Sequence, residues 1–434
     1  MVRALVCRLN IGHRWLAETS FEDGFRRCNR CGRSDRPSAN WSKYLFAGHR
    51  PDNAWNPGSV VKRNAAMVAV ALVLSGCTYV TPDETATTPP AKLSAALEAF
   101  ADDASAHGAP AVVFHVRNGD QEELRATGVN NLESNKKAVP ADKTWIIGAG
   151  TPMVAVSVMK LVEAGAVGLG DPVSAHLPEF TAIFPAWDRV TVRDLLGSTS
   201  GLPDYFPPLI ESRSLDELQT RPLTFEERLR IAAGVDLPPG PVSYFAWSAT
   251  DWEVLGWLLE RKHNQGLEEV LAKDVFEPAG MGNTHLAVAG LPPEPMLHGY
   301  VLESGNRRDF TRIDAVAGSA DSGVISTVED LSRFVAALTT GRLIREETWK
   351  SMMEAELFPL GGIRPSDDIC PGTRHVFVSG GGGPYSVQSV SSVDGQQQAT
   401  VATVLPPREL NVADAPPLVP EMEDAILQTA MSMC

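Results

Sequence analysis

Strand patterns at both ends of residues 92–434 enclose a long helical stretch, and this arrangement limits the folds open to the chain. Near the start, Ala111–Arg117, the turn pair Asn118-Gly119 and Glu123–Gly128 are typical of a β-hairpin. Further strand patterns cover residues 376–379, 385–393 and 399–405, with a hairpin turn at Asp394-Gly395. Helical patterns dominate residues 152–274. We therefore predict an α/β fold: an antiparallel sheet flanked by helices and completed by the C-terminal third, plus a helical lobe.

Three further segments carry helix signals. Residues 93–107 and 419–433 are predicted helices at the two ends of the folded body. Ser326-Thr-Val-Glu329 has the spacing of a capping box, which predicts that Ser326 caps a helix. In that helix the apolar residues share one face, as expected for packing against a core: Val328, Leu331, Phe334, Val335 and Leu338.

Size and charge set outer limits on function. The chain has 434 residues, 44% of them hydrophobic, which is enough for a large core and more than one lobe. Its formal net charge is −15. An acidic chain of this kind is repelled by phosphate backbones, so we expect no nucleic-acid partner.

Four metal-binding residue types lie close together in residues 1–35. Cys7, His13, Cys28 and Cys31 could complete a tetrahedral Zn²⁺ shell, since Cys28-Asn-Arg-Cys31 lets two thiolates face one ion. This stretch resembles small zinc-ribbon proteins of bacteria and phages, which implies a structural zinc ion. The alternative is a set of reduced, unliganded thiols in an unfolded leader. Residues 36–61 follow as a predicted flexible linker.

Residues 62–77 resemble a lipoprotein-type secretory signal. Lys62-Arg63 precedes a short apolar run, and Leu74-Ser-Gly-Cys77 follows it. The run is too short to span a bilayer comfortably. The resemblance implies a lipid on Cys77 and a place on the extracytoplasmic face of the cell envelope, with residues 78–91 as a Thr/Pro spacer. The alternative is that this segment is a buried helix and that its cysteine matches the lipoprotein pattern by coincidence.

The zinc-ribbon-like segment and the export signal are in conflict, because a cleavable signal normally begins at the N-terminus. One hypothesis is that translation starts near Val61 or Met67, so that residues 1–60 do not belong to the mature protein. Peptides from residues 1–60 linked to the folded body in a membrane fraction would rule this out.

Four long strings in residues 92–434 carry a family resemblance: residues 161–180, 191–203, 276–284 and 317–327. In content and order they resemble the serine β-lactamase and penicillin-binding-protein-like hydrolases, which include class C β-lactamases, D-alanyl-D-alanine carboxypeptidases and related esterases. The resemblance implies the β-lactamase-like α/β fold for residues 92–434. It implies no cofactor for this domain.

The first catalytic element that this family implies is Ser-x-x-Lys at the start of a helix, where the lysine takes the proton of the attacking serine. The flanking residues place this pair at Ala149 and Pro152. Alignment on the downstream helix without a gap gives Gly148 and Thr151 instead. Neither alignment provides a serine or a lysine, and Pro152 suits the first turn of a helix.

The other two elements also differ from the family pattern. Trp247 and Ala249 stand where the family has the tyrosine and asparagine of Tyr-x-Asn. An indole donates one hydrogen bond and accepts none, so Trp247 cannot act as a base. In the third element, which helps to build an oxyanion hole, Ser379 stands in place of a lysine or histidine, whereas the glycines, including Gly381, are kept.

These substitutions predict a non-catalytic binding or regulatory protein of the cell envelope, with a cell-wall peptide or another small acyl-type ligand. A hydrolase with a different nucleophile is the second hypothesis, and a structural envelope component the third. Other serines are weak candidates for that nucleophile: Ser157 with Lys160 in mid-helix, Ser59 with Lys62 in the leader, and Ser379, Ser248 and Ser200 without an obvious base.

Two cysteines lie in the folded body, Cys370 before the third element and Cys434 at the end of the last helix. The chain resembles exported members of the family in which a disulfide joins these two regions. The resemblance therefore implies a Cys370–Cys434 disulfide here. The alternative is two free thiols.

Overall fold

The structure is a computed structural model that describes residues 92–290, 295–355, 357–410 and 418–434, together with three short strands before residue 36. Those strands pair in the antiparallel order β1-β2-β3: Thr19–Glu22, Phe25–Cys28 and Ser34–Asp35. Cys28 is in β2, whereas Cys7, His13, Cys31 and Cys77 lie outside the described residues. Within the described part, no helix has both the length and the apolar character needed to cross a membrane.

A seven-stranded antiparallel sheet is the centre of the folded body, in the order β12-β13-β14-β15-β4-β5-β6. Segments from both ends of the body therefore pair directly, because β15 lies beside β4, as predicted. The strands are β4 (Ala111–Asn118), β5 (Gln121–Asn131), β6 (Lys136–Lys137), β12 (Arg364–Cys370), β13 (Thr373–Gly382), β14 (Tyr385–Ser392) and β15 (Gln397–Val404).

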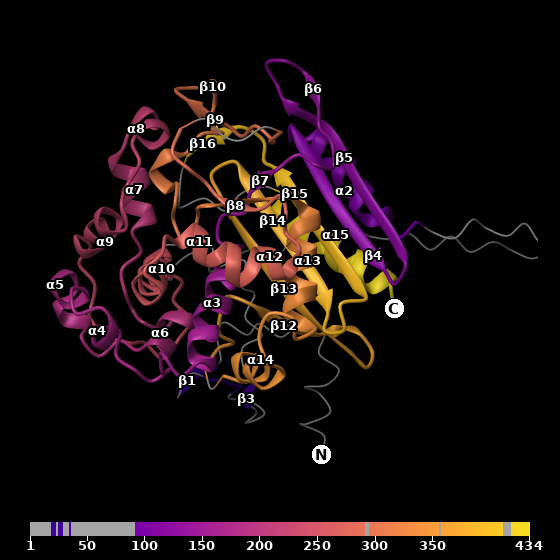
Figure 1. Ribbon diagram of the computed structural model, residues 1–434. Helices are drawn as coiled ribbons and strands as arrows, with labels where there is room; N and C mark the ends of the chain where they lie inside the picture. The colour runs from indigo at the N-terminus through magenta and orange to yellow at the C-terminus, as the bar shows by residue number, and fades with distance from the viewer. Residues whose placement is uncertain are drawn as a thin grey trace, which may run out of the picture.

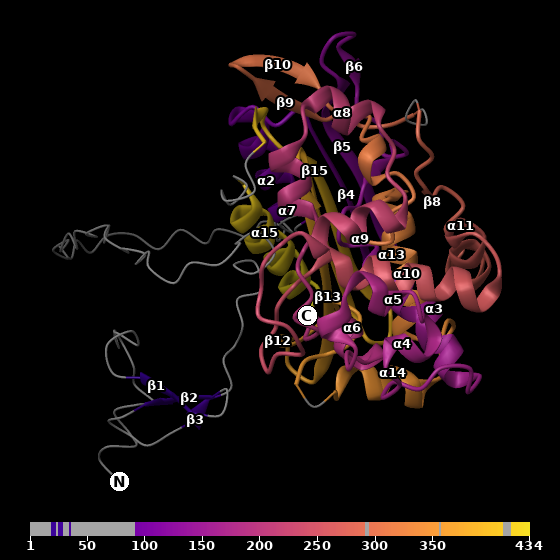
Figure 2. The ribbon, with the colours of Figure 1, turned by 90° about the vertical axis from the view of Figure 1, so that its left-hand side faces the viewer.

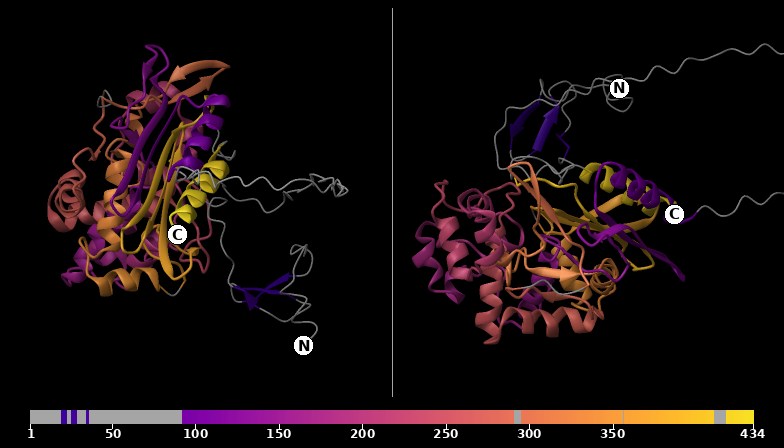
Figure 3. Two further views of the ribbon diagram at one scale, coloured as in Figure 1. Left: turned by 90° about the vertical axis from the view of Figure 1, so that its right-hand side faces the viewer. Right: turned by 90° about the horizontal axis from the view of Figure 1, so that it is seen from above.

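Helices cover both faces of this sheet. On one face, α2 (Ala95–Ala106) and α15 (Val419–Ser432) pack against each other and against the central strands (Figure 3). On the other face α13 (Val328–Thr339) packs against β14, β15 and β4. The alternation of side chains along β4 serves both layers: Val112, Phe114 and Val116 join the core under α2 and α15, whereas Ala111 and Val113 join the larger core on the other side.

The helical lobe lies beyond α13 (Figures 1 and 2). Its helices are α3 (Thr151–Glu163), α4 (Val173–His176), α5 (Phe180–Ile183), η2 (Pro185–Trp187), α6 (Val192–Leu196), α7 (Phe206–Ser212), α8 (Leu215–Thr220), α9 (Phe225–Ala233), α10 (Ala249–His263), α11 (Leu267–Leu271), the π-helix η3 (Ala272–Phe276) and α12 (Glu277–Ala279). The predicted two-lobe α/β fold is thus confirmed.

Short elements connect the two lobes. One small sheet has the order β7-β11-β8, from Thr144–Trp145, Val324–Ser326 and His285–Leu286. A second has the order β10-β9-β16, from Asn306–Asp309, Tyr300–Glu303 and Arg408–Glu409. The 3₁₀ helix η4 (Asp314–Val316) and helix α14 (Glu346–Met353) complete the body.

The prediction of the cap of α13 was wrong by one residue. The N-cap is Thr327, whose hydroxyl accepts a hydrogen bond from the backbone N–H of Asp330. Ser326 is instead the last residue of β11, paired with Thr144, and its hydroxyl contacts that of Thr284. The apolar face of the helix is buried as predicted.

A disulfide joins Cys370, at the end of β12, to Cys434 after α15, with the Cα atoms 5.5 Å apart. This is the pairing that the family resemblance implied. It ties the C-terminal helix to the edge strand of the large sheet.

Candidate functional site

The residues of the two candidate pairs for the Ser-x-x-Lys positions, Ala149 with Pro152 and Gly148 with Thr151, all lie at the start of α3 or in the turn before it. Gly148 adopts a positive φ of 73° in the turn before the helix, a conformation that suits glycine. Thr151 is the first residue of α3, and its buried hydroxyl donates to the carbonyl of Gly148 at 2.8 Å. Ala149 is fully buried, and Pro152 lies within the first turn, as predicted. Of these four residues, only Gly148 lines the adjacent cavity.

The second element reaches Gly148 from the segment before α10, a helix that packs against α3. Trp247 precedes α10, and its Cζ2 atom lies 3.9 Å from the position that a Cβ atom on Gly148 would take. The Trp247 ring packs against that of Trp252, with centroids 5.7 Å apart. Ala249 is buried at the start of α10 and does not line the cavity. The indole of Trp247 therefore faces the start of α3.

The third element approaches Gly148 through its glycines. Strand β13 passes so close to the chain before α3 that a Cβ atom on Gly380 would lie 2.2 Å from the carbonyl oxygen of Ile147. The same atom would lie 2.3 Å from the backbone nitrogen of Ala149, so only glycine fits there. Ser379, the preceding residue, is half-buried and lines the cavity, whereas Gly381 does not.

The cavity where the three elements meet has a volume of about 30 Å³. This is room for about one water molecule, whereas sites for small ligands usually enclose about 300 to 1,000 Å³. Aromatic side chains take up the space: the lining residues are Gly148, Phe245, Trp247, Pro359, Gly362, Ile363, Arg364, Phe377 and Ser379. Phe245 in turn packs edge-on against Phe358, with centroids 5.7 Å apart.

Arg364 is the one charged side chain among these lining residues, and its guanidinium is already engaged. It forms an ion pair with Glu423 at 2.9 Å and lies over the ring of Phe377, 4.3 Å from the centroid. Glu423 does not line the cavity, and the Phe377 ring has no group that could attack a substrate. Ser379 has no hydrogen bond to another described residue, and none of the residues lining the cavity with it is a base.

Buried carboxyl groups lie behind this cavity, and the sequence interpretation missed them. The backbone carbonyl of Asp321 accepts from the N–H of Gly148 at 3.1 Å. Burial raises the pKa of Asp321 to about 7 and that of Asp204 to about 6. Burial also raises the pKa of Asp251, which accepts a hydrogen bond from Ser200 at 2.5 Å. None of these carboxyl groups lines the cavity, and the serine that contacts Asp251 is itself buried, so they are not placed to act on a group in the cavity.

The Asp321 loop is held by a buried polar frame. The guanidinium of Arg228 pairs with Glu253 at 2.9 Å, and both side chains are nearly inaccessible. Ser319 donates to the other oxygen of Glu253 and accepts from the backbone N–H of Asp321 at 3.2 Å. The hydroxyl of Tyr205 lies 3.3 Å from that of Ser319. This frame fixes the backbone that Gly148 contacts.

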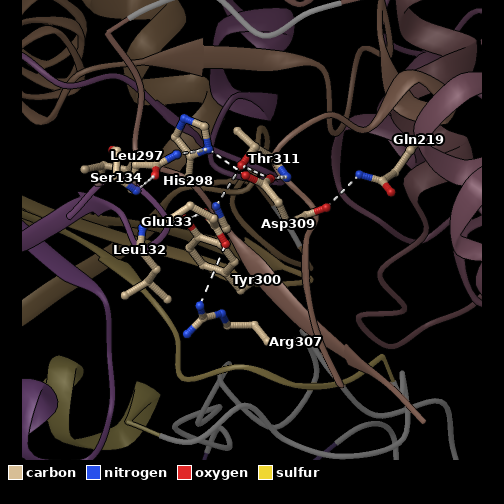
Figure 4. A network of polar contacts seen from close by, with 12 residues as sticks. Leu132, Glu133, Ser134, Gln219, Leu297, His298, Tyr300, Arg307, Asp309 and Thr311 are labelled. Carbon is tan, nitrogen blue, oxygen red and sulfur yellow. Dashed lines mark hydrogen bonds and ion pairs between the residues drawn. The ribbon is translucent and has the colours of Figure 1, made fainter. Parts of the chain in front are cut away.

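A second polar network anchors the hairpin β9–β10 beyond the glycine-rich end of β13 (Figure 4). His298 contacts Asp309 at 2.7 Å, and Tyr300 donates to Glu133 in the loop after β5 at 2.7 Å. Arg307 lies over the Tyr300 ring. The hydroxyl of Tyr385 in β14 donates to the carbonyl of Leu297 at 3.1 Å, which links this network to the large sheet.

The alternative serines lack the setting of a nucleophile. Ser157 is fully buried in α3, and Lys160 donates instead to the carbonyl of Asp274 at 2.6 Å. Ser248 and Ser200 are also buried. Ser59 and Lys62 lie outside the described residues.

One serine does contact a histidine, but far from the start of α3. Ser332 lies 2.8 Å from Nδ1 of His115, whose Nε2 lies 2.7 Å from Glu122. This chain of contacts lies between α13 and strands β4 and β5, and Ser332 is 1% exposed. Burial lowers the pKa of His115, with the neighbouring Glu122 acting in the opposite direction. The Ser332 hydroxyl also contacts Thr400 at 2.7 Å, so the group fits a structural network.

Comparisons with known proteins agree with this fold. A family profile described as Beta-lactamase matches residues 94–385. The chain therefore belongs to the beta-lactamase family, the group of serine hydrolase-like proteins that also contains penicillin-binding proteins.

Two curated relatives match parts of the chain. Protein flp of Staphylococcus aureus (strain COL) is 21% identical over 230 residues, which cover 52% of this chain and 44% of that protein. Penicillin-binding protein 4* of Bacillus subtilis (strain 168) is 28% identical over 203 residues, or 43% of each chain. The matches thus span less than half the length of these relatives.

Solved structures show the same fold. D-amino acid amidase from Ochrobactrum anthropi SV3, in complex with D-phenylalanine, has a TM-score of 0.66 at 18% identity and covers 78% of this chain and 98% of its own. D-stereospecific amidohydrolase from Streptomyces sp. has a TM-score of 0.62 at 20% identity, covering 72% and 94%. At this identity the likeness concerns the fold.

Proposed function

We propose that this protein is a non-hydrolytic member of the beta-lactamase family that acts at the cell envelope, anchored through a lipid on Cys77. One observation carries the proposal: where family members place a serine and its bases, Gly148 and Trp247 face each other across a cavity of about 30 Å³. Loss of the nucleophile alone lowers kcat by about 10⁶ in a well-studied serine hydrolase. The paired Arg364 and the buried carboxyl groups supply no replacement.

The aromatic filling supports a role carried by surfaces outside the cavity that Gly148, Trp247 and Ser379 line, which we call the old pocket. Ligands of the kind named for the solved relatives, such as phenylalanine or its amide, need far more room than one water molecule. A cell-wall peptide or another small acyl-type ligand would enter this pocket only after Trp247 moves away. A structural or regulatory role needs no such movement.

Hydrolysis assays test the proposal. The purified chain is incubated with a chromogenic cephalosporin, with a serine β-lactamase as the active control, and with D-phenylalanine amide, with D-amino acid amidase from Ochrobactrum anthropi SV3 as the active control. We expect rates indistinguishable from buffer. Turnover that Ser379→Ala abolishes would establish the second hypothesis, a hydrolase with a non-standard nucleophile that uses the one cavity-lining serine.

The envelope location has a separate test. Membrane fractions from cells that express the full chain are compared with those from cells expressing Cys77→Ser. We expect the wild type in the membrane fraction, with mass spectrometry showing lipid on Cys77, and the variant released from it. A wild-type chain without lipid would contradict the anchor and leave the catalytic question untouched.

A further inference from the structure

A larger groove lies away from the old pocket and is lined by α14 and by parts of β12 and β13. Figure 1 shows α14 at the lower end of the large sheet. Its volume is about 550 Å³, within the usual range of about 300 to 1,000 Å³ for small-ligand sites. The walls come from three places: one face of α14, the end of α13 at residues 339–341, and the neighbouring parts of β12 and β13. No residue of this groove lines the old pocket.

The groove side of α14 combines apolar and charged groups. Glu346, Trp349, Lys350, Met353 and Glu354 follow the spacing i, i+3, i+4, i+7, i+8, so they share one side of the helix. Trp349 and Met353 are half-buried and form an apolar floor. The indole N–H of Trp349 has no hydrogen-bond partner among the described residues, so a ligand could accept from it.

The charges around this floor are not paired with each other. Lys350, Glu346 and Glu354 form no side-chain hydrogen bond or ion pair with another described residue. Arg374, across the groove, forms a long ion pair with Asp367 at 3.8 Å, and both side chains are more than half exposed.

Elsewhere on the surface, oppositely charged side chains with the same helical spacing do form ion pairs. Arg230 contacts Glu226 at 2.6 Å and Arg333 contacts Glu329 at 2.5 Å, each one helical turn apart. The spacing of Glu346 and Lys350 allows the same contact, yet their side chains stay apart. Glu346 and Lys350 therefore offer one unpaired charge of each sign to the groove.

The negative and the positive groups lie at different positions along the groove. Thr339, the last residue of α13, lines the groove at the negative end of that helix dipole, and Glu346 follows after a short loop. Lys350 lies one turn further along α14, and Arg374 lies on the strand side. An ammonium group suits the first position and a carboxylate the second.

We propose that this groove binds a short peptide with a free amino terminus and a free C-terminal carboxylate. The ammonium lies near Glu346, the carboxylate between Lys350 and Arg374, and an apolar side chain on Trp349. Glu354 disfavours acidic side chains at the far end of α14. The groove shares no lining residue with the old pocket, so this binding proposal is tested separately from the proposed loss of hydrolysis.

Calorimetry on the full chain tests this site with trialanine as the probe, beside its N-acetylated and C-amidated forms. We expect saturable binding of trialanine, weakened at least about tenfold by either cap, because each cap removes a charge-assisted hydrogen bond. The variants Glu346→Gln and Lys350→Gln/Arg374→Gln should weaken trialanine binding to the same degree. These side chains are exposed, so the variants should fold normally. Lys273→Gln and Arg230→Gln, on the exposed surface of the helical lobe, are matched controls that should bind as the wild type.

A second readout locates the ligand. Trialanine should change the tryptophan fluorescence of the wild type, and Trp349→Phe should remove this change while calorimetry still detects binding. The proposal is overturned if millimolar trialanine gives no saturable heat, or if capped peptides and the charge variants bind like the unmodified pair. Binding that responds to Trp247→Phe and not to Lys350→Gln/Arg374→Gln would place the ligand in the old pocket and overturn it as well.

Discussion

The old pocket and the polar frame directly behind it are built in opposite ways. In the frame, Arg228, Glu253 and Ser319 are buried and each has a polar partner. In the pocket, aromatic rings fill the space and no serine lies beside a base. Removing one partner of the frame would leave a buried charge unpaired, which costs about 3 to 5 kcal/mol. No comparable penalty requires a catalytic pair at the start of α3, so the comparison separates the residues that hold the scaffold together from the positions at which the family resemblance expects catalytic residues.

Breaking the frame should have the largest effect. Arg228→Met leaves Glu253 buried without its cation, which we expect to lower the free energy of unfolding by about 3 to 5 kcal/mol. Urea denaturation followed by circular dichroism measures this. Arg230→Met, which breaks an exposed pair, is the matched control and should cost about 0.5 kcal/mol or less. Equal losses of unfolding free energy in the two variants would show that the buried pair contributes no more to stability than the exposed pair.

Removal of the disulfide should have a smaller effect. Cys434→Ser opens a bond that spans 64 residues, and we expect a loss of about 2 to 4 kcal/mol, because the unfolded chain gains freedom. The same denaturation measurement under non-reducing conditions detects it. The pocket should be unaffected, since the disulfide ties α15 to β12. An unchanged midpoint, or a large rise in hydrolysis, would contradict this separation.

Emptying the pocket should cost less still. Trp247→Ala removes a half-buried ring that packs on Trp252, so we expect a loss of about 2 kcal/mol, below the range for fully buried tryptophans. The variant should also admit small aromatic molecules, which would raise its melting temperature while leaving that of the wild type unchanged. If the wild type responds equally, Trp247 does not close the pocket.

The buried carboxyl groups predict a pH dependence of stability. In the folded state the pKa of Asp321 is raised by burial to about 7, above its ordinary value of 3.8, so the unfolded chain releases this proton first as the pH rises. The contribution of Asp321 to stability is therefore present at acidic pH and is lost between about pH 4 and pH 7. Asp204 acts in the same direction.

The variant Asp321→Asn isolates this effect. We expect the difference in melting temperature, variant minus wild type, to be larger at pH 8 than at pH 5. His115 acts in the opposite direction below its ordinary pKa of 6.5, because burial lowers its pKa, but it contributes equally to both proteins. A difference that stays constant with pH would mean that Asp321 is ionised in the fold.

Local patterns in the sequence predicted most of the scaffold. Alternation and turn pairs located β4, β5, β13, β14 and β15 of the large sheet but missed β6 and the edge strand β12, and helical periodicity located α2, α13 and α15. The cap of α13 was misplaced because Ser326 and Thr327 both suit a cap, and only the pairing of β11 decides between them. Helical periodicity does not show whether a residue at a helix boundary caps the helix or pairs in a neighbouring strand.

The candidate site was predictable in identity but not in shape. The sequence showed which residues stand at the start of α3, before α10 and in β13. It could not show that Trp247 and Phe245 reduce the cavity to about 30 Å³, because ring positions depend on packing between lobes. The carboxyl groups of Asp321 and Asp251 gave no local signal either, since their burial comes from elements distant in sequence.

Intact-protein mass spectrometry tests the central claim most directly. The wild-type chain is incubated with a penicillin and, separately, with a fluorophosphonate, beside Penicillin-binding protein 4* as the reactive control. The account predicts an unchanged mass for this chain and a stoichiometric adduct on the control. A stoichiometric adduct on this chain, mapped to any serine lining the pocket, would contradict it.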